Sequence, residues 1–245
     1  MNNETALLAK EMQYSIIIPV FNEEDSILPL FHTLKEIMDC LGERYEVIFI
    51  DDGSTDYSLK QLNELSKKND FLRIMHFNIN RGQGKAMEEG FHNAKGRVII
   101  SMDSDLQNDP KDIPKLISEL NKGYDLVCGW RHARSDAFMK KIKSRIGNFL
   151  QRKITGLNLH DMSCTMRAYK KEVIAGITLQ EKFDFSILPY IISQTKNIKI
   201  TEVKINHQYR KFGKTKYKCF NTIFGTVFCF IKLFYIYRNS EKVIT

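Results

Sequence analysis

Short buried-strand patterns and helix patterns alternate along the first two thirds of the chain. Apolar runs of strand length occupy residues 14–20, 45–50, 72–77, 97–102 and 125–129. Helix patterns lie between them, within residues 27–41, 59–65, 84–94 and 113–120. The first and last of these carry apolar residues at the spacing of one helix face. This alternation predicts an α/β fold, in which helices cover both faces of a mainly parallel sheet.

The pattern changes after the fifth strand. Residues 135–152 are basic and predicted to be helical, residues 160–169 form a polar loop that leads into a strand, and residues 198–206 alternate like an edge strand. The chain has no internal repeat and no low-complexity linker. We therefore expect one domain over residues 1–210 and a C-terminal extension over residues 211–245.

The composition indicates a folded, basic protein. Hydrophobic residues make up 43% of the 245 residues and charged residues 27%, which excludes wholesale disorder. The 37 basic and 29 acidic residues give a net charge of +8, which favours phosphates, nucleic acid or an anionic bilayer as partners. Five scattered cysteines without a CxxC pair, and an N-terminus without a signal sequence, favour a reducing compartment, the cytoplasm.

Residues 219–237 are nearly all apolar or aromatic, and basic residues flank them. About 20 apolar residues are needed to span a bilayer, a length that this segment barely reaches. Lys232 lies within it and would cost roughly 2.5–3.5 kcal/mol if it were at the bilayer centre. We therefore favour a helix lying in the headgroup region over a membrane span. A helix buried in the domain or in a subunit interface is the alternative.

Acidic side chains follow three of the predicted strands, in residues 19–23, 51–56 and 103–109. Parallel strands end at one edge of a sheet, where ligands of open α/β sheets bind. Asp103 and Asp105, spaced as Asp-x-Asp, suit a hard divalent cation that shares its shell with phosphate oxygens, and Gln107 offers a further oxygen. The alternative is turn and capping chemistry.

Capping is our interpretation for some of these polar residues. Asp109 precedes Pro110 and is predicted to be a helix N-cap with proline at the first helical position. One of the residues 54–56 is expected to cap the second helix. For Asp51 and Asp52, a turn and a ligand site remain equal alternatives.

The stretch Gly82-Gln-Gly-Lys85 resembles parts of a dinucleotide fingerprint and of a P-loop, and matches neither. Position 87 is Met where the third glycine would stand, and Ala86 has no hydroxyl for a metal. Its helix start and its Lys85 still suit a phosphate. Further candidate phosphate ligands follow in the C-terminal half; they are Arg131, Arg167, Arg210 and Lys216.

Five ordered motifs carry a family resemblance. They are Ile18-Pro-Val-Phe-Asn-Glu-Glu24, Val47-Ile-Phe-Ile-Asp-Asp-Gly-Ser-Thr-Asp56, Asn80-Arg-Gly-Gln-Gly-Lys85, Met102-Asp-Ser-Asp-Leu-Gln-Asn-Asp-Pro110 and Phe212-Gly-Lys-Thr-Lys-Tyr217. The chain thereby resembles family 2 glycosyltransferases of the GT-A (Rossmann-like) fold. Within them it resembles the polyprenyl-phosphate transferases, the group of dolichol-phosphate mannose synthase. Residues 160–169 are most similar to the branch that transfers formamido-arabinose to undecaprenyl phosphate.

The resemblance implies a role for each candidate residue. The donor would be held by Pro19, Phe21, Glu23, Asp52, Lys85 and Asp103. Mg²⁺ or Mn²⁺ would be held by Asp103, Asp105 and Gln107. Donor or acceptor phosphates would be received by Arg131, Arg167, Arg210 and Lys216. The catalytic set would be Asp103, Asp105, Arg131 and Asp161, with Asp161 orienting Arg167 or the acceptor.

The expected activity is inverting, metal-dependent transfer of a sugar from a nucleotide sugar to a polyprenyl phosphate. UDP is preferred over GDP on the branch resemblance. The protein would lie at the cytoplasmic face of the membrane as a peripheral protein, and a homo-oligomer or a separate membrane partner stays open. The alternatives are transfer to a glycan hydroxyl and a non-catalytic, membrane-peripheral binding protein. Nucleic-acid binding is not expected, because aromatic residues do not interleave the cations.

Overall fold

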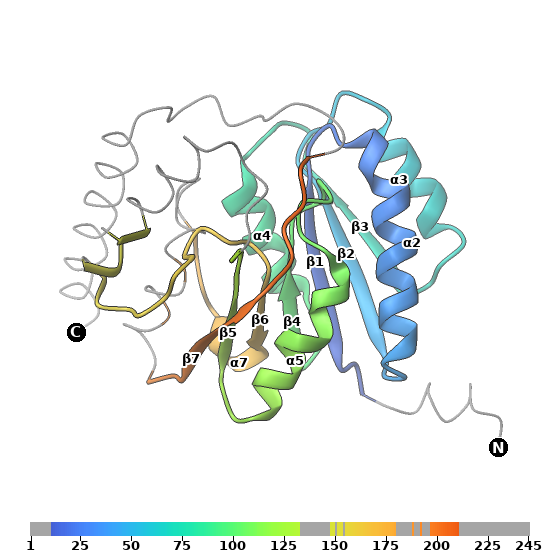
Figure 1. Cartoon of the computed structure of the whole chain (residues 1–245). Helices are drawn as coiled ribbons and strands as arrows, with labels where there is room; N and C mark the ends of the chain where they lie inside the picture. The colour runs from blue at the N-terminus through green and yellow to red at the C-terminus, as the bar shows by residue number, and fades with distance from the viewer. Residues whose placement is uncertain are drawn as a thin grey trace, which may run out of the picture.

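A seven-stranded sheet forms the centre of the computed structural model, which describes residues 11–132, 148–149, 151–153, 155–179, 188, 192 and 197–210 (Figure 1). The strand order is β3-β2-β1-β4-β6-β5-β7. The strands are β1 (Tyr14–Val20), β2 (Tyr45–Asp51), β3 (Leu72–His76), β4 (Val98–Ser101), β5 (Leu126–Trp130), β6 (Arg167–Lys170) and β7 (Ile200–Lys204). The five strands predicted in the first two thirds of the chain are all present, and so are the two later ones.

The sheet is parallel except at one strand. β1 pairs in parallel with β2 and β4, β2 with β3, and β5 with β7, whereas β6 runs antiparallel to both β4 and β5. Ser101, the last residue of β4, pairs with Arg167, the first residue of β6. The segment entering β6 therefore lies beside the segment leaving β4. This placement brings Thr165 to the acidic loop after β4.

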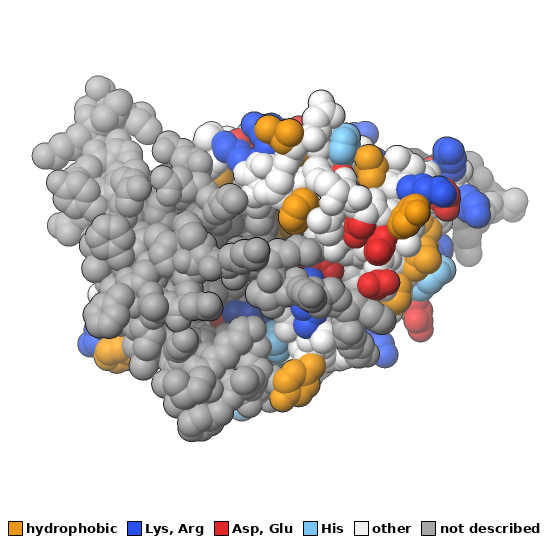
Figure 2. Space-filling model, turned by 90° about the horizontal axis from the view of Figure 1, so that it is seen from above, with side chains coloured by type: hydrophobic (Ala, Val, Ile, Leu, Met, Phe, Trp, Pro, Cys, Tyr) orange, Lys and Arg blue, Asp and Glu red, His pale blue; other side chains and the backbone are white. Residues whose placement is uncertain are grey.

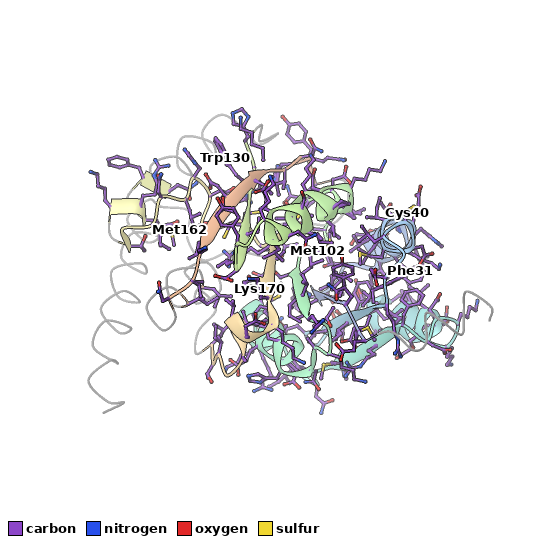
Figure 3. The ribbon with its side chains drawn as sticks, turned by 90° about the horizontal axis from the view of Figure 1, so that it is seen from below. Phe31, Cys40, Met102, Trp130, Met162 and Lys170 are labelled. Atoms are coloured by element: carbon purple, nitrogen blue, oxygen red, sulfur yellow. The ribbon has the colours of Figure 1, made fainter. Side chains whose placement is uncertain are left out.

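Helices pack on both faces of the sheet, as predicted. One face carries α2 (Glu24–Cys40), α3 (Ser58–Ser66) and α5 (Ile113–Asn121), and the other carries α4 (Gln83–Asn93) and α7 (Lys171–Ile174). Successive residues of β1 serve opposite cores: Ile16 and Ile18 pack with the first set of helices, and Ile17 with the second. The first core also contains Phe31 of α2 and Met102, both labelled in Figure 3.

Two predicted caps are present at helix starts. The Asp109 carboxylate accepts the Lys111 backbone N–H at 3.0 Å, at the start of a short 3₁₀ turn (Pro110–Asp112) that leads into α5. The Asp56 carboxylate accepts the Ser58 backbone N–H at 2.9 Å, at the start of α3. These two carboxylates therefore serve the fold by satisfying helix N–H groups.

Several expectations fall on parts of the chain that the structure does not describe. They concern Lys216, most of the predicted helix at 135–152, the extension over residues 211–245 and its apolar segment 219–237. Within the described residues, no helix combines the length and the apolar character needed to cross a bilayer.

Gly90 gives a direct test of how closely α4 packs on the sheet. A Cβ at this position would lie 2.3 Å from Ile17 Cγ2 and 3.0 Å from Ile50 Cδ1. Overpacking of this kind costs about 1–3 kcal/mol, and the higher helix propensity of alanine returns up to about 1 kcal/mol. We therefore expect Gly90→Ala to lower the free energy of unfolding by about 1–2 kcal/mol in urea titrations.

A double-mutant cycle isolates the contact with Ile17. Ile17→Ala removes the methyl group that the new Cβ meets, so the loss in the double variant should be clearly smaller than the sum of the two single losses. Additive losses, or an unchanged stability of Gly90→Ala, would contradict this packing.

Candidate active site

Polar side chains from six segments meet where the parallel strands end. Glu23 follows β1, Asp103 and Asp105 follow β4, Arg131 follows β5, and Arg210 follows β7. Gln83 from the start of α4 and Thr165 from the segment entering β6 join them. Figure 2 looks onto this end of the molecule, where acidic side chains appear among other polar ones. The meeting of acidic loops that the sequence predicts is confirmed.

The Asp103 carboxylate is held at both of its oxygens. Gln83 Nε2 donates to Oδ1 at 2.6 Å, and Thr165 Oγ1 donates to Oδ2 at 2.6 Å. Thr165 is itself fixed by its backbone, because its carbonyl accepts the Ser101 hydroxyl at 2.7 Å. The carboxylate is thus oriented by two elements that are distant in sequence.

The charge on Asp103 is unfavourable in this setting. Burial and the nearby charge of Asp105 raise the pKa of Asp103 to about 6, although the Thr165 hydrogen bond and the charges of Arg131 and Arg210 act to lower it. Burial also raises the pKa of Asp105. Raised pKa values in two neighbouring carboxylates show that burial and mutual repulsion outweigh the positive charges around them.

A strained turn holds Asp105. Leu106 has a φ of +61°, a left-handed conformation that is uncommon for residues other than glycine, and the Gln107 N–H donates to Asp105 Oδ1 at 3.1 Å. The second oxygen, Oδ2, accepts from Arg210 Nη1 at 3.1 Å. Arg210 Nη2 also donates to the Glu23 carboxylate. Arg210 therefore bridges the loop after β1 and the loop after β4.

The donor set of this loop fits a hard divalent cation. Asp103 and Asp105 supply carboxylate oxygens, which are the ligands that Mg²⁺ and Mn²⁺ prefer. In the structure, Arg210 pairs with Asp105 and neutralises its charge. Gln107 Nε2 donates to the Gln208 carbonyl at 3.3 Å, a bond that does not involve the amide oxygen suggested as a metal ligand. No group of three or more His, Cys, Asp or Glu side chains suited to a metal occurs within the described residues.

Asp52 organises the loop before α4. Its carboxylate accepts the backbone N–H groups of Arg81 and Gly82, at 2.7 and 2.9 Å, and the Asn80 amide at 2.9 Å. It is almost fully buried. The backbone N–H groups of Arg81 and Gly82, just before the helix start suggested for a phosphate, are therefore already used by Asp52.

The remaining residues expected to bind the donor differ in their surroundings. Pro19 in β1 and the adjoining Phe21 are partly buried at the carboxyl edge of the sheet. Lys85 lies in the first turn of α4, where Nζ pairs with both oxygens of Glu88 at 3.0 and 3.1 Å. Lys85 thus pairs with Glu88, three residues further along α4, a local contact that the sequence analysis did not consider.

Arg131 and Asp161 form a two-pronged ion pair. Arg131 Nε and Nη2 donate to the two Asp161 oxygens at 2.6 and 2.8 Å, and both side chains are largely buried. The sequence suggested that Asp161 orients Arg167 or the acceptor, and the structure shows that it also orients Arg131. The pair holds a guanidinium close enough to Asp103 to lower the pKa of that carboxyl.

Arg167 lies inside the molecule. Its side chain is fully buried, and Nη2 donates to the Met162 carbonyl at 2.5 Å. A phosphate at the carboxyl edge has no access to a guanidinium placed in this way. We therefore leave Arg167 out of the phosphate-binding set.

Gln83 and Thr165 are the site residues that sequence reasoning missed. Gln83 lies within the motif at 80–85, whose glycines and lysine are the more familiar phosphate-binding residues. Thr165 lies within the polar loop at 160–169. The neighbouring sequence gives no signal for either residue, because each contacts Asp103 only once the chain has folded.

Comparison with curated proteins gives a relative that matches most of this chain. A dodecaprenyl-phosphate galacturonate synthase of Rhizobium johnstonii is 37% identical over 211 residues, which cover 85% of this chain and 62% of the relative. The chain therefore spans about three fifths of the length of this curated relative.

Solved structures share the fold. The glucosyl-3-phosphoglycerate synthase of Mycobacterium tuberculosis in complex with UDP matches with a TM-score of 0.66 and 18% identity, over 94% of this chain and 83% of that one. Its complex with Mn²⁺, UDP-glucose and phosphoglyceric acid matches with a TM-score of 0.63 and 20% identity, over 85% and 75% of the two chains. The likeness confirms the predicted GT-A type of fold.

The family profile described as "Glycosyl transferase family 2" matches residues 15–178, from β1 to beyond α7. This stretch is more than half of the chain and contains every site residue named above except Arg210 and the undescribed Lys216. The chain belongs to glycosyl transferase family 2.

Proposed function

We propose that this chain is an inverting, metal-dependent glycosyltransferase that moves a sugar from a nucleotide sugar to a polyprenyl phosphate. We place it at the cytoplasmic face of the membrane, as a peripheral protein. The observation that carries the proposal is the Asp103 carboxylate, held by Gln83 and Thr165 beside Asp105 at the carboxyl edge of the sheet. A protein that only bound acidic lipid would not need two such carboxylates.

The donor site is assigned to the loops after β1, β2 and β4. Pro19, Phe21 and Glu23 lie on the side of the nucleoside, and Asp52 shapes the loop that borders it. Asp103 and Asp105 would hold Mg²⁺ or Mn²⁺ against the donor diphosphate. When bound, such an ion neutralises the charge that develops on the departing nucleotide. The Mn²⁺ and UDP named for the solved fold neighbours support this assignment and the preference for UDP.

The reaction is a direct displacement at the anomeric carbon. An acceptor phosphate oxygen forms the new bond to this carbon, the bond to the diphosphate oxygen breaks, and the nucleoside diphosphate leaves with the electron pair. A phosphate monoester has a second pKa near 6 and is mostly a dianion at pH 7, so no side chain has to remove a proton. Catalysis then rests on positioning and on charge, to which the Arg131–Asp161 pair contributes a fixed cation.

A polyprenyl phosphate is the acceptor that the relatives favour. The Rhizobium johnstonii relative is named for a dodecaprenyl-phosphate product, and its name adds a uronic acid to the sugars worth testing. The basic residues at 214–218 and the apolar segment 219–237 are where we expect a lipid phosphate to arrive. The alternative acceptor is a glycan hydroxyl, which would require a general base.

An assay with two acceptors distinguishes transfer to a polyprenyl phosphate from transfer to a glycan hydroxyl. The full chain is incubated with Mg²⁺ or Mn²⁺ and a labelled nucleotide sugar, with UDP-galacturonic acid, UDP-glucose and GDP-mannose in parallel. Each donor is offered undecaprenyl phosphate in detergent or an oligosaccharide. We expect label in the lipid fraction with a UDP sugar, and mass spectrometry of the product identifies the sugar. Label found only in the oligosaccharide would replace the lipid acceptor, and no transfer to either would favour a binding protein.

Asp103→Asn tests the carboxylate itself. The amide keeps the size of the side chain and removes its charge, so we expect turnover to fall by about 10²–10³-fold, the loss seen when one stabilising group is removed from a transition state. Metal-dependent binding of the nucleotide should weaken in parallel.

Asp109→Asn is the matched control. This residue lies six positions further along the same acidic segment and caps the turn before α5. It should retain nearly full turnover, since asparagine is also a good N-cap. Equal activities of the two variants would contradict the role given to Asp103.

The raised pKa of Asp103 predicts a pH dependence of stability in the metal-free protein. Its folded pKa of about 6 exceeds the unfolded value of about 4, so the folded state binds more protons in between. The free energy of unfolding contributed by this group therefore falls as the pH rises from about 4 to 6. Urea titrations in EDTA should show this slope reduced in Asp103→Asn. An unchanged slope would contradict the raised pKa of Asp103.

A further inference from the structure

The segment Ile205–Arg210 crosses the acidic loop after β4. The Gln208 N–H donates to the Gln107 carbonyl at 2.9 Å, and Asn108 and His207 form an isolated antiparallel bridge. Nearer β7, the Asn206 N–H donates to the buried Asp112 carboxylate at 2.6 Å. These backbone contacts place the end of the segment over the candidate metal ligands.

Arg210 ends this segment with its guanidinium between two carboxylates. It contacts Glu23 through Nη2 and Asp105 Oδ2 through Nη1, the latter at 3.1 Å. All three side chains are largely buried, with 18% of Arg210, 8% of Glu23 and 13% of Asp105 exposed. Screening by solvent is weak there, so the guanidinium neutralises charge that would otherwise be costly.

Arg210 uses the oxygen that a metal would need. Asp105 Oδ1 already accepts the Gln107 N–H, and Oδ2 accepts from Arg210. A divalent ion bound at Oδ2 would lie next to a guanidinium, and two cations sharing one carboxylate oxygen repel each other strongly in a site of low dielectric. The guanidinium and the ion therefore compete for Asp105.

We propose that Arg210 is a built-in substitute cation, which occupies Asp105 in the metal-free protein and leaves it when a divalent ion binds. This inference rests on the proposed metal dependence. The released guanidinium becomes available to a phosphate arriving from the acceptor side. Metal and donor would therefore bind before the lipid phosphate, and the protein would avoid presenting an empty acidic site.

The surrounding contacts allow such a movement to stay local. The backbone bonds of Asn206 and Gln208 do not involve Asp105, so the segment remains attached when Arg210 leaves. Tyr209, the residue before Arg210, has a side chain with 67% exposed surface. Turning the chain at Tyr209 therefore removes little buried surface from Tyr209 itself.

The test is a Mn²⁺ titration of the full chain without nucleotide, followed by the EPR signal of free Mn²⁺ at 0.15 M salt. Arg210→Met removes the guanidinium and keeps an apolar stem of similar length. We expect its dissociation constant for Mn²⁺ to be about tenfold lower than that of the wild type, because the competing cation is gone. Arg210→Lys should bind Mn²⁺ with nearly wild-type affinity, since it restores the charge.

Lys204→Ala is the matched control for net charge. Lys204 is exposed in β7 and lies over the Trp130 ring, with Nζ 5.3 Å from the ring centroid. Its removal changes the overall charge by the same amount without freeing Asp105, so we expect less than a twofold change in Mn²⁺ affinity. Circular dichroism confirms that each variant is folded, and Arg210→Gln replaces Arg210→Met if that variant is not.

The outcomes distinguish this inference from the proposed function. Tighter Mn²⁺ binding in Arg210→Met, without tightening in Lys204→Ala, supports the exchange of Arg210 for the metal ion at Asp105. Equal or weaker binding in Arg210→Met, with Mn²⁺ still bound, overturns the exchange and leaves the metal-dependent function intact. Equal tightening in Lys204→Ala would reduce the effect to net charge and also overturn it. Mn²⁺ binding in none of the variants would overturn the exchange as well, and the acceptor assay would then decide the proposed function by itself.

Discussion

Electrostatic repulsion among carboxylates at one edge of a parallel sheet is the constraint on which this site depends. Parallel strands deliver their following loops to the same edge, so Glu23, Asp103 and Asp105 are brought together by the topology itself. Burial and mutual repulsion then raise the pKa of Asp103. A fold that concentrates negative charge in this way stays folded only if donors and cations compensate it.

The compensation comes from distant parts of the chain. Gln83 and Thr165 satisfy the two oxygens of Asp103, and Arg210 reaches Asp105 from beyond β7. The antiparallel insertion of β6 between β4 and β5 is what brings Thr165 within reach. The site is therefore oriented before any ligand binds, as expected where catalysis relies on fixed charges and positions.

The elements of the fold were predictable because their signals are local. The apolar run of β1, the N-cap Asp109 and the capping carboxylate Asp56 each act within a few residues of their own position. The site was predictable only in part. The strand-end rule placed Asp103 and Asp105, whereas the surroundings of Arg167 depend on tertiary contacts, which put this residue in the interior. The pair of Lys85 with Glu88, three residues further along α4, is a local contact that sequence reasoning overlooked. The resemblance named Asp161, and only the structure showed that Arg131 is its partner.

The central claim is that Asp103 and Asp105 bind a divalent ion that carries the donor diphosphate. Anomalous diffraction at the manganese edge, from crystals grown with Mn²⁺ and UDP, tests it most directly. The account predicts one strong anomalous peak within coordination distance of both carboxylates and of the diphosphate oxygens. Bound UDP with no peak there, or a peak at another group of side chains, would contradict it.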